Sequence, residues 1–373
     1  MPVKAQVVIS AMETWAPKRL AADWDNVGLQ IGNPADDVSG VLVTLDVDEA
    51  VLAEAANSGA NFVVTHHPVI FKPISHLRGD LPLGRLISKA IAAGIGIYAA
   101  HTNLDCARGG VDDTLAAALG LAGIEALSAT YEEQLVKLVV FVPRDHAHAV
   151  REALARAGAG YMGKYSDSAF WAEGTGFFRP REGANPYIGE EGKLEAVEEV
   201  RLETILPGEL AGRVVKAMLA AHPYEEAAYD LYPLMNGGNS YGLGKIGSLP
   251  GEMSLGAVAA RVKGALGIGR VRVSGDLEKP IKEVAVCGGS GASLIHKAAF
   301  RGADAFITGD IRYHDALEAR RLDLAIIDAG HFATELVILP VVAEKLQQTL
   351  VGAGYPEVLV TVARSGRDPF KNL

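Results

Sequence analysis

Two apolar runs separated by a helical segment constrain the fold of this chain more than any other feature. Residues 40–47 read GVLVTLDV, a nearly continuous valine-rich run typical of a strand buried on both faces. Asp48 is a helix cap for a segment reaching about Ser58, and residues 61–65, NFVVT, form the next strand. Because a helix connects the two strands, they are predicted to be parallel. The pattern indicates an α/β fold.

Composition restricts the classes of protein to consider. The chain has 373 residues, 49% of them hydrophobic, which is enough for two or three domains with cores of their own. A net charge of −10 argues against nucleic acid as the default partner. Two cysteines are too few for a disulfide framework or a cysteine-based zinc site. The N-terminus lacks a signal-peptide pattern and no apolar run reaches a membrane span, so we expect a soluble cytoplasmic protein.

A pair of histidines ends the second strand. His66 and His67 follow residues 62–65 directly, and Pro68 prevents the strand from continuing inside a sheet. Neutral imidazole is the commonest metal ligand in proteins. A bend here lets one ring reach each of two metal ions, or both rings reach a common cleft. The alternative interpretation is two histidines in a polar loop.

Two later strand ends carry similar side chains. The strand at 95–100 ends in a loop holding His101 and Asp105, and ligands gather beyond the carboxyl ends of strands in open α/β sheets. His331 ends the strand at 324–331, and Glu335 follows four residues later on the same face of a helical turn. This spacing suits a chelating pair, or simply an acidic residue near the positive end of a helix dipole. The strand ends together supply five nitrogen and oxygen ligands, which are His66, His67, Asp105, His331 and Glu335. Such a set suits two adjacent divalent ions such as zinc, manganese, iron or nickel.

The middle of the chain has a different pattern. Residues 131–237 read β–α–β–β–α–β, the ferredoxin-like arrangement, and a Gly-rich joint at 235–244 follows. We therefore expect residues 131–237 to be a domain inserted between two α/β segments, 1–130 and 238–373. In the second segment, the turn CGGSG at 287–291 lies between a strand and a helix. Such a turn can bind phosphate through its backbone N–H groups. A tight connection between the strand and the helix explains it equally well.

The motifs WDNVGLQIG, THHP, HTNLD, GGSG, TGDIRYHDA and GHFATE occur here in an order that resembles the Nif-three-like family, whose members carry the name GTP cyclohydrolase I type 2 homologue. The resemblance covers both α/β flanks, which it implies form one core around a dinuclear metal centre. It implies that the metal ligands are His66, His67, Asp105, His331 and Glu335. It also implies a PII/CutA-like insert and a ring-like homohexamer whose metal sites face an internal cavity. The chain differs from many members of that family at one position, where it has Asp112 and they have Asn.

Further residues have supporting roles in this interpretation. His101 and His314 are assigned to proton transfer or to orienting the ligands, and Asp310 can orient them too. Each has an alternative role in capping a helix or stabilising a loop. The predicted function is a metal-dependent hydrolase acting on a nucleotide or another small phosphorylated or cyclic substrate. The alternative is a non-enzymatic metal-binding regulator or metallochaperone whose insert senses a small molecule.

Overall fold

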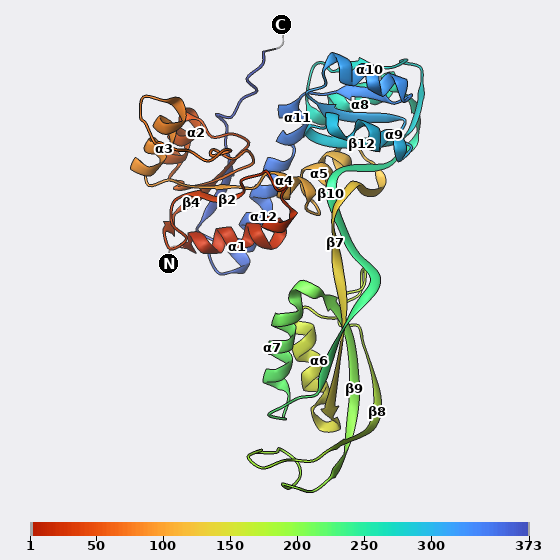
Figure 1. Cartoon of the computed structure of the whole chain (residues 1–373). Helices are drawn as coiled ribbons and strands as arrows, with labels where there is room; N and C mark the ends of the chain where they lie inside the picture. Colours follow the sequence, from red (N-terminus) through yellow and green to blue (C-terminus); the bar gives the residue numbers. More distant parts are fainter. Residues whose placement is uncertain (1–2, 372–373) are drawn as a thin grey trace. The chain divides into compact units, whose positions relative to one another are not determined.

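The computed structural model describes residues 3–371, which form two compact units (Figure 1). The first unit combines the residues up to Tyr131 with those from Tyr241 onward, and the second comprises residues 132–240. No helix within residues 3–371 is long and apolar enough to cross a membrane. The described residues form both helices and sheets, so the chain is a mixed α/β protein, as the alternation of apolar strands and helical segments predicted.

The first sheet of the first unit is built mainly by the N-terminal part of the chain. Its hydrogen-bonded order is β15 (Leu359–Val362), β4 (Gly40–Thr44), β5 (Phe62–Thr65), β6 (Gly96–Ala99) and β2 (Gly28–Ile31). Strands β4 and β5 are parallel, which confirms the prediction from the helical connection between them. Every residue of β4, β5 and β6 is buried, as expected for a sheet covered on both faces.

Helices cover both faces of this sheet. Alternate residues of β4 divide between two cores: Val41 and Val43 pack with α1 (Ala5–Trp15) and α12 (Ile338–Gly352), whereas Leu42 packs with α2 (Glu49–Ser58) and α3 (Pro82–Ala92). The predicted cap of α2 is confirmed, because the Val51 amide donates to the Asp48 carboxylate at 2.8 Å. The short helices α4 (Thr102–Cys106) and α5 (Val111–Ala118) follow β6.

The second sheet of this unit comes from the C-terminal part of the chain. Its order is β11 (Arg272–Ser274), β14 (Ala325–Asp328), β13 (Ala305–Gly309), β12 (Pro280–Ser290) and β10 (Tyr229–Ser254). Strands β12, β13 and β14 are parallel, so their carboxyl ends meet at one edge. The connecting helices are α8 (Leu255–Leu266), α9 (Ile295–Phe300), α10 (Tyr313–Arg321) and α11 (His331–Leu336). A small pair of strands, β1 (Val3–Lys4) and β3 (Asp37–Val38), completes the unit.

The second unit has its own core. Its elements follow the order β7 (Ala122–Pro143), α6 (Ala147–Arg156), β8 (Ala169–Phe178), β9 (Glu195–Pro207), α7 (Ala211–Ala221) and β10. The strands pair in the order β10, β7, β9 and β8 (Figure 1). Apolar side chains of α6 and α7, among them Val150 and Val214, pack with buried residues of β7 and β9 such as Leu138 and Leu202.

The Gly-rich joint predicted at 235–244 contains the point between Ser240 and Tyr241 where the chain passes from one unit to the other, but it is a strand and not a loop. These residues lie inside β10, a continuous strand that, like β7, contributes to both units. Polar and glycine-rich composition suggested a loop, but the glycines allow close contact with the neighbouring backbone instead. A Cβ atom on Gly238 would meet the Glu133 carbonyl oxygen at 2.4 Å, and one on Gly242 would meet that of Ser128 at 2.0 Å.

Candidate metal centre

The carboxyl end of β5 delivers two histidines to one place. The backbone amides of His66 and His67 continue the pairing with β4 beyond the strand, donating to the carbonyls of Thr44 at 3.0 Å and Leu45 at 2.8 Å. The two imidazole rings lie 5.1 Å apart, between centroids. Both rings therefore lie in one cluster, which is compatible with either arrangement that the sequence left open.

Two short helices bring the other candidate residues. His101 is the residue before α4, and its ring centroid lies 5.2 Å from that of His66. Asp105, within α4, places a carboxylate oxygen 3.5 Å from His66 Nε2. His331 begins α11 and Glu335 lies one turn later, with Glu335 Oε1 3.1 Å from His331 Nε2. The structure therefore brings together the five residues predicted as ligands, and His101 with them.

Each of the four imidazoles is fixed through Nδ1, which leaves Nε2 directed at the cluster. The acceptors are Ala100 O for His66 (2.8 Å), Asp46 for His67 (2.8 Å), Asp25 for His101 (2.9 Å) and Asp310 for His331 (2.7 Å). Metal-binding histidines almost always donate their second ring nitrogen to a carboxylate or a carbonyl in this way. The arrangement fixes both the tautomer and the ring orientation before any ion binds.

Glu335 lies at the centre of the cluster. Its Oε2 is 3.0 Å from His67 Nε2, and its Oε1 lies 3.1 Å from His331 Nε2 and 3.6 Å from His66 Nε2. Two ligand atoms on one tetrahedral zinc ion are separated by about 3.4 Å, given metal–ligand bonds of about 2.1 Å. The observed separations are therefore compatible with atoms that share an ion.

Orphaned polar atoms show that this cluster fits a metal. His66 Nε2, Asp105 Oδ1 and Glu335 Oε2 are buried, and within the described chain none of them has a hydrogen-bond partner of acceptable geometry. Buried polar atoms without partners are costly, and three of them directed at one place call for a shared ligand. A nitrogen and oxygen donor set without sulfur suits a divalent ion such as zinc, manganese, iron or nickel.

The carboxylates also change the proton affinity of the histidines. Burial lowers the pKa of His67, but the hydrogen bond to Asp46 and the nearby negative charge of Glu335 outweigh it and raise that pKa to about 10. The hydrogen bond to Glu335 is the main reason that the pKa of His331 rises to about 9. Burial and the charge of Asp112 raise the pKa of Asp105 well above its usual value. In the absence of metal, these raised pKa values favour protons on His67, His331 and Asp105, at the positions where a metal ion would bind.

Glycines at the ends of β12 and β13 make room for these ligands. A Cβ atom on Gly289, which has φ +61°, would meet Glu335 Oε1 at 2.2 Å and His331 Nε2 at 3.2 Å. One on Gly309 would meet the His331 backbone nitrogen at 2.5 Å. The next residue, Asp310, has φ 57°, a left-handed conformation that is uncommon outside glycine. This conformation accompanies its hydrogen bond to His331, and Gly289 gives the CGGSG turn a role as space for the metal ligands.

Sequence reasoning missed two residues that orient histidines. Asp25, in the WDN motif, accepts hydrogen bonds from His101 and from the backbone and side chain of Thr102. Asp46 follows β4, and its position beyond a strand end is the signal that would have found it. His314 is exposed on α10, where its ring contacts Tyr313, and it is absent from the groups of potential ligands found among residues 3–371.

A cavity of about 780 Å³ opens beside the cluster. His67 and His331 line it together with the carboxylates Asp46 and Asp310 that orient them. Arg270, Arg272 and Lys371 also line it, as do Asp368 and Asp328, which is paired with Arg272. The cavity is large enough for a small-molecule ligand, which typically occupies about 300–1,000 Å³.

Comparison with known proteins gives one consistent result. A family model described as Duf34/NIF3 (NGG1p interacting factor 3) matches residues 3–369. A GTP cyclohydrolase 1 type 2 homolog of Halalkalibacterium halodurans is 47% identical over 98% of each chain, and one of Bacillus subtilis is 46% identical over 90% of each chain. A crystal structure of a Bacillus cereus protein related to NIF3 is 47% identical, with a TM-score of 0.94 over the full length of both chains.

Proposed function

This chain belongs to the Duf34/NIF3 family, and we propose that it is a metal-dependent hydrolase with a dinuclear centre at the cluster of four histidines. The observation that carries the proposal is the set of buried atoms without partners, contributed by His66, Asp105 and Glu335. His67, His331 and Glu335 would hold one ion, and His66, Asp105 and Glu335 the other. Glu335 is the residue shared between the two, because its oxygens face histidines of both groups.

The charge around the cluster supports two ions rather than one. Five carboxylates contact the four imidazoles or face them at ion-pair distance: Asp25, Asp46, Asp105, Asp310 and Glu335. When the histidines are neutral, as metal ligation requires, this leaves a large negative charge in a partly buried place. Two divalent ions offset four of the five charges, whereas a single ion offsets only two.

The cavity beside the cluster supports a small anionic substrate. Arg270, Arg272 and Lys371 line the same cavity as His67 and His331, and of these Arg272 is already paired with Asp328. Guanidinium and ammonium groups are the common ligands of phosphate and carboxylate groups. A nucleotide or another phosphorylated molecule therefore suits the cavity, with its reacting part toward the histidines.

His101 is assigned to proton transfer in this proposal. Its Nδ1 is hydrogen-bonded to Asp25, which orients the ring. The hydrogen bonds from His101 and Thr102 outweigh the effect of burial and lower the pKa of Asp25 to about 2, so Asp25 stays ionised. Divalent ions supply Lewis acidity and lower the pKa of water when bound. The chain itself supplies the fixed ligands, the basic residues that line the cavity and a group that accepts or gives a proton.

The test is turnover that depends on metal content. Protein stripped with a chelator and reloaded with zinc or manganese is incubated with a panel of nucleotides and phosphorylated metabolites, and products are identified by mass spectrometry. We expect a product whose yield rises with the metal content per chain, and no product from a His331→Gln variant. Metal released to a chelator or a partner protein, without turnover of any compound, would favour the alternative of a metallochaperone or regulator.

Assembly and the identity of the insert are further parts of the proposal. We infer from the family resemblance a homohexamer in the cytoplasm, with the second unit as a PII/CutA-like insert. Light scattering of the purified protein tests the stoichiometry, because six chains give six times the mass of 39.2 kDa. A monomer or dimer at physiological concentration would remove this part and leave the metal centre of the single chain unaffected.

A further inference from the structure

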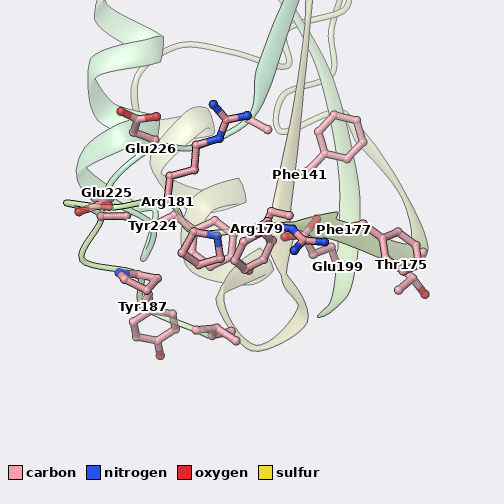
Figure 2. A pocket seen from close by; sticks show the side chains of 18 of the residues that line it. Phe141, Thr175, Phe177, Arg179, Arg181, Tyr187, Glu199, Tyr224, Glu225 and Glu226 are labelled. Atoms are coloured by element: carbon pink, nitrogen blue, oxygen red, sulfur yellow. The ribbon is translucent and has the colours of Figure 1, made fainter. Parts of the chain in front are cut away.

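The second unit contains a cavity of about 1020 Å³ that is separate from the metal centre. It is lined by β8, by β9, by the segment that connects them and by residues that follow α7 (Figure 2). Aromatic side chains, among them Phe178, Tyr187 and Tyr224, form part of the wall. Nothing in the proposed hydrolase reaction uses this cavity, so its lining must be explained separately.

Glu199, on β9, is the buried acidic group of this cavity. Only 9% of its surface is exposed. Its carboxylate lies against β8 at Gly176, where a Cβ atom would meet Glu199 Oε2 at 2.0 Å, so the absence of a side chain there makes room for it. Among the described residues, no lysine, arginine or histidine forms an ion pair with Glu199. Burying a carboxylate without a cation is costly, and a bound cation would offset that cost.

Tyr224 lies beside this carboxylate with its ring in an aromatic group. Its ring centroid is 5.6 Å from that of Phe178 and 6.3 Å from that of Tyr187. The Tyr224 hydroxyl is buried and has no hydrogen-bond partner of acceptable geometry within residues 3–371. Burial and the negative charge of Glu199 raise the pKa of Tyr224, which keeps the hydroxyl protonated. A buried carboxylate and ring faces in one cavity are the two features that attract organic cations.

The charge of the whole lining favours a cation over an anion. Five glutamates line the cavity against three arginines. Two of the arginines already have partners: Arg179 donates to the Gly192 carbonyl at 2.9 Å, and Arg201 pairs with Glu203 at 3.0 Å. Arg181 and Glu226 also line the cavity, and both are labelled in Figure 2. The cavity therefore carries net negative charge around an aromatic wall.

We propose that this cavity is a binding site for a small organic cation, an amine or amidine attached to an aromatic or apolar body. The cationic group contacts the Glu199 carboxylate, and the body packs against Tyr224, Phe178 and Tyr187. This site is independent of the metal centre and of the proposed hydrolase reaction.

Three probes of similar size test the proposal on the full-length, metal-loaded protein. Benzamidine is a cation, benzamide is its neutral analogue, and phenyl phosphate is an anion. In isothermal titration calorimetry we expect benzamidine to bind at least about tenfold more tightly than benzamide, because a charge-assisted hydrogen bond is lost in the neutral analogue. Phenyl phosphate binding in this cavity more tightly than benzamidine, or equal affinity for benzamidine and benzamide, would overturn the proposal.

Matched variants locate the binding. Glu199→Gln keeps the size and removes the charge, so benzamidine affinity should fall at least about tenfold. Glu198→Gln is the control, because the preceding residue of a strand points to the opposite face and Glu198 is exposed outside the cavity. Equal benzamidine affinity in the Glu199 variant and the unmodified protein would contradict the assignment. The comparison of benzamidine with benzamide decides the question even where a variant folds poorly.

Discussion

At the scale of single residues, Glu335 lies between the histidines of the candidate metal centre. One of its oxygens faces His66 and His331, and the other faces His67. Burial raises the pKa of this carboxyl, but the charge of His66 and hydrogen bonds with the neighbouring histidines outweigh burial and lower the pKa well below its usual range. It is therefore ionised at neutral pH and available to cations on both sides. A carboxylate in this position could contact two ions, one through each oxygen.

Replacing Glu335 with Gln should remove one metal ion. The amide keeps the size of the side chain but loses the charge that two neighbouring dications need. We expect the metal content to fall from two to about one ion per chain, measured by elemental analysis, while circular dichroism stays unchanged. Glu344→Gln, on the exposed face of α12, is the control and should retain two ions. Two tightly held ions in the Glu335 variant would exclude Glu335 as a ligand.

The histidines make the stability of the metal-free protein depend on pH. The pKa values of His67 and His331 are raised to about 10 and about 9, so their contribution to stability is complete below the unfolded value of about 6.5. This contribution is lost as the pH rises through 9 and 10. We therefore expect the Tm of chelator-treated protein to fall by several degrees between pH 7 and pH 10.

The same measurement on metal-loaded protein is the comparison. Bound metal replaces the protons on these histidines, so its Tm should change less over that pH range. A His67→Gln variant should lose part of the pH dependence in the metal-free state. A Tm of metal-free protein that stays constant or rises from pH 7 to pH 10 would show that these groups are not held as the structure indicates.

At the scale of elements, the candidate metal centre depends on the ends of strands and on the glycines located there. Strand β5 ends at His66 and His67, and strands β12 and β13 end beside α11. Gly289 shows why a glycine stands there: its backbone approaches Glu335 so closely that no side chain fits. Sequence alone left this turn open between a phosphate cradle and a tight connection. The deciding information is the position of Glu335, some 46 residues later in the chain.

The Gly289→Ala variant tests this packing. A methyl group there would overlap Glu335 Oε1 and would also force a left-handed backbone on a residue with a side chain. We expect metal content to drop below two ions per chain and the Tm to fall. Gly264→Ala, in the last turn of α8 with open space around it, is the control and should keep both metal content and stability. Full metal content in the Gly289 variant would show that the contact is not required.

The strands and helices were largely predictable, because apolar periodicity and the Asp48 cap are local signals. The parallel pairing of β4 and β5 followed from their helical connection. The five candidate ligands were visible as strand-end residues, but their meeting in one cluster is a long-range property that periodicity does not contain. The continuous strand β10 was missed for the same reason, since its glycines are explained only by the backbone of β7 beside it.

At the scale of the whole molecule, the candidate metal centre belongs entirely to the first unit. Every residue of the cluster lies outside residues 132–240, and the apolar core of the second unit contains only residues between 138 and 221. We therefore expect a variant that lacks residues 132–240, with the ends joined by a short linker, to fold and to bind two ions per chain. A soluble deletion variant with fewer than two ions would show that the second unit supports the centre.

Anomalous diffraction from crystals grown with zinc or manganese tests the central claim most directly. Data collected above and below the absorption edge of the metal locate each ion without reference to the surrounding chain. The account predicts two peaks per chain, one beside His67 and His331 and one beside His66 and Asp105, with Glu335 in contact with both. A single peak at full occupancy, or peaks outside this cluster, would contradict the dinuclear centre.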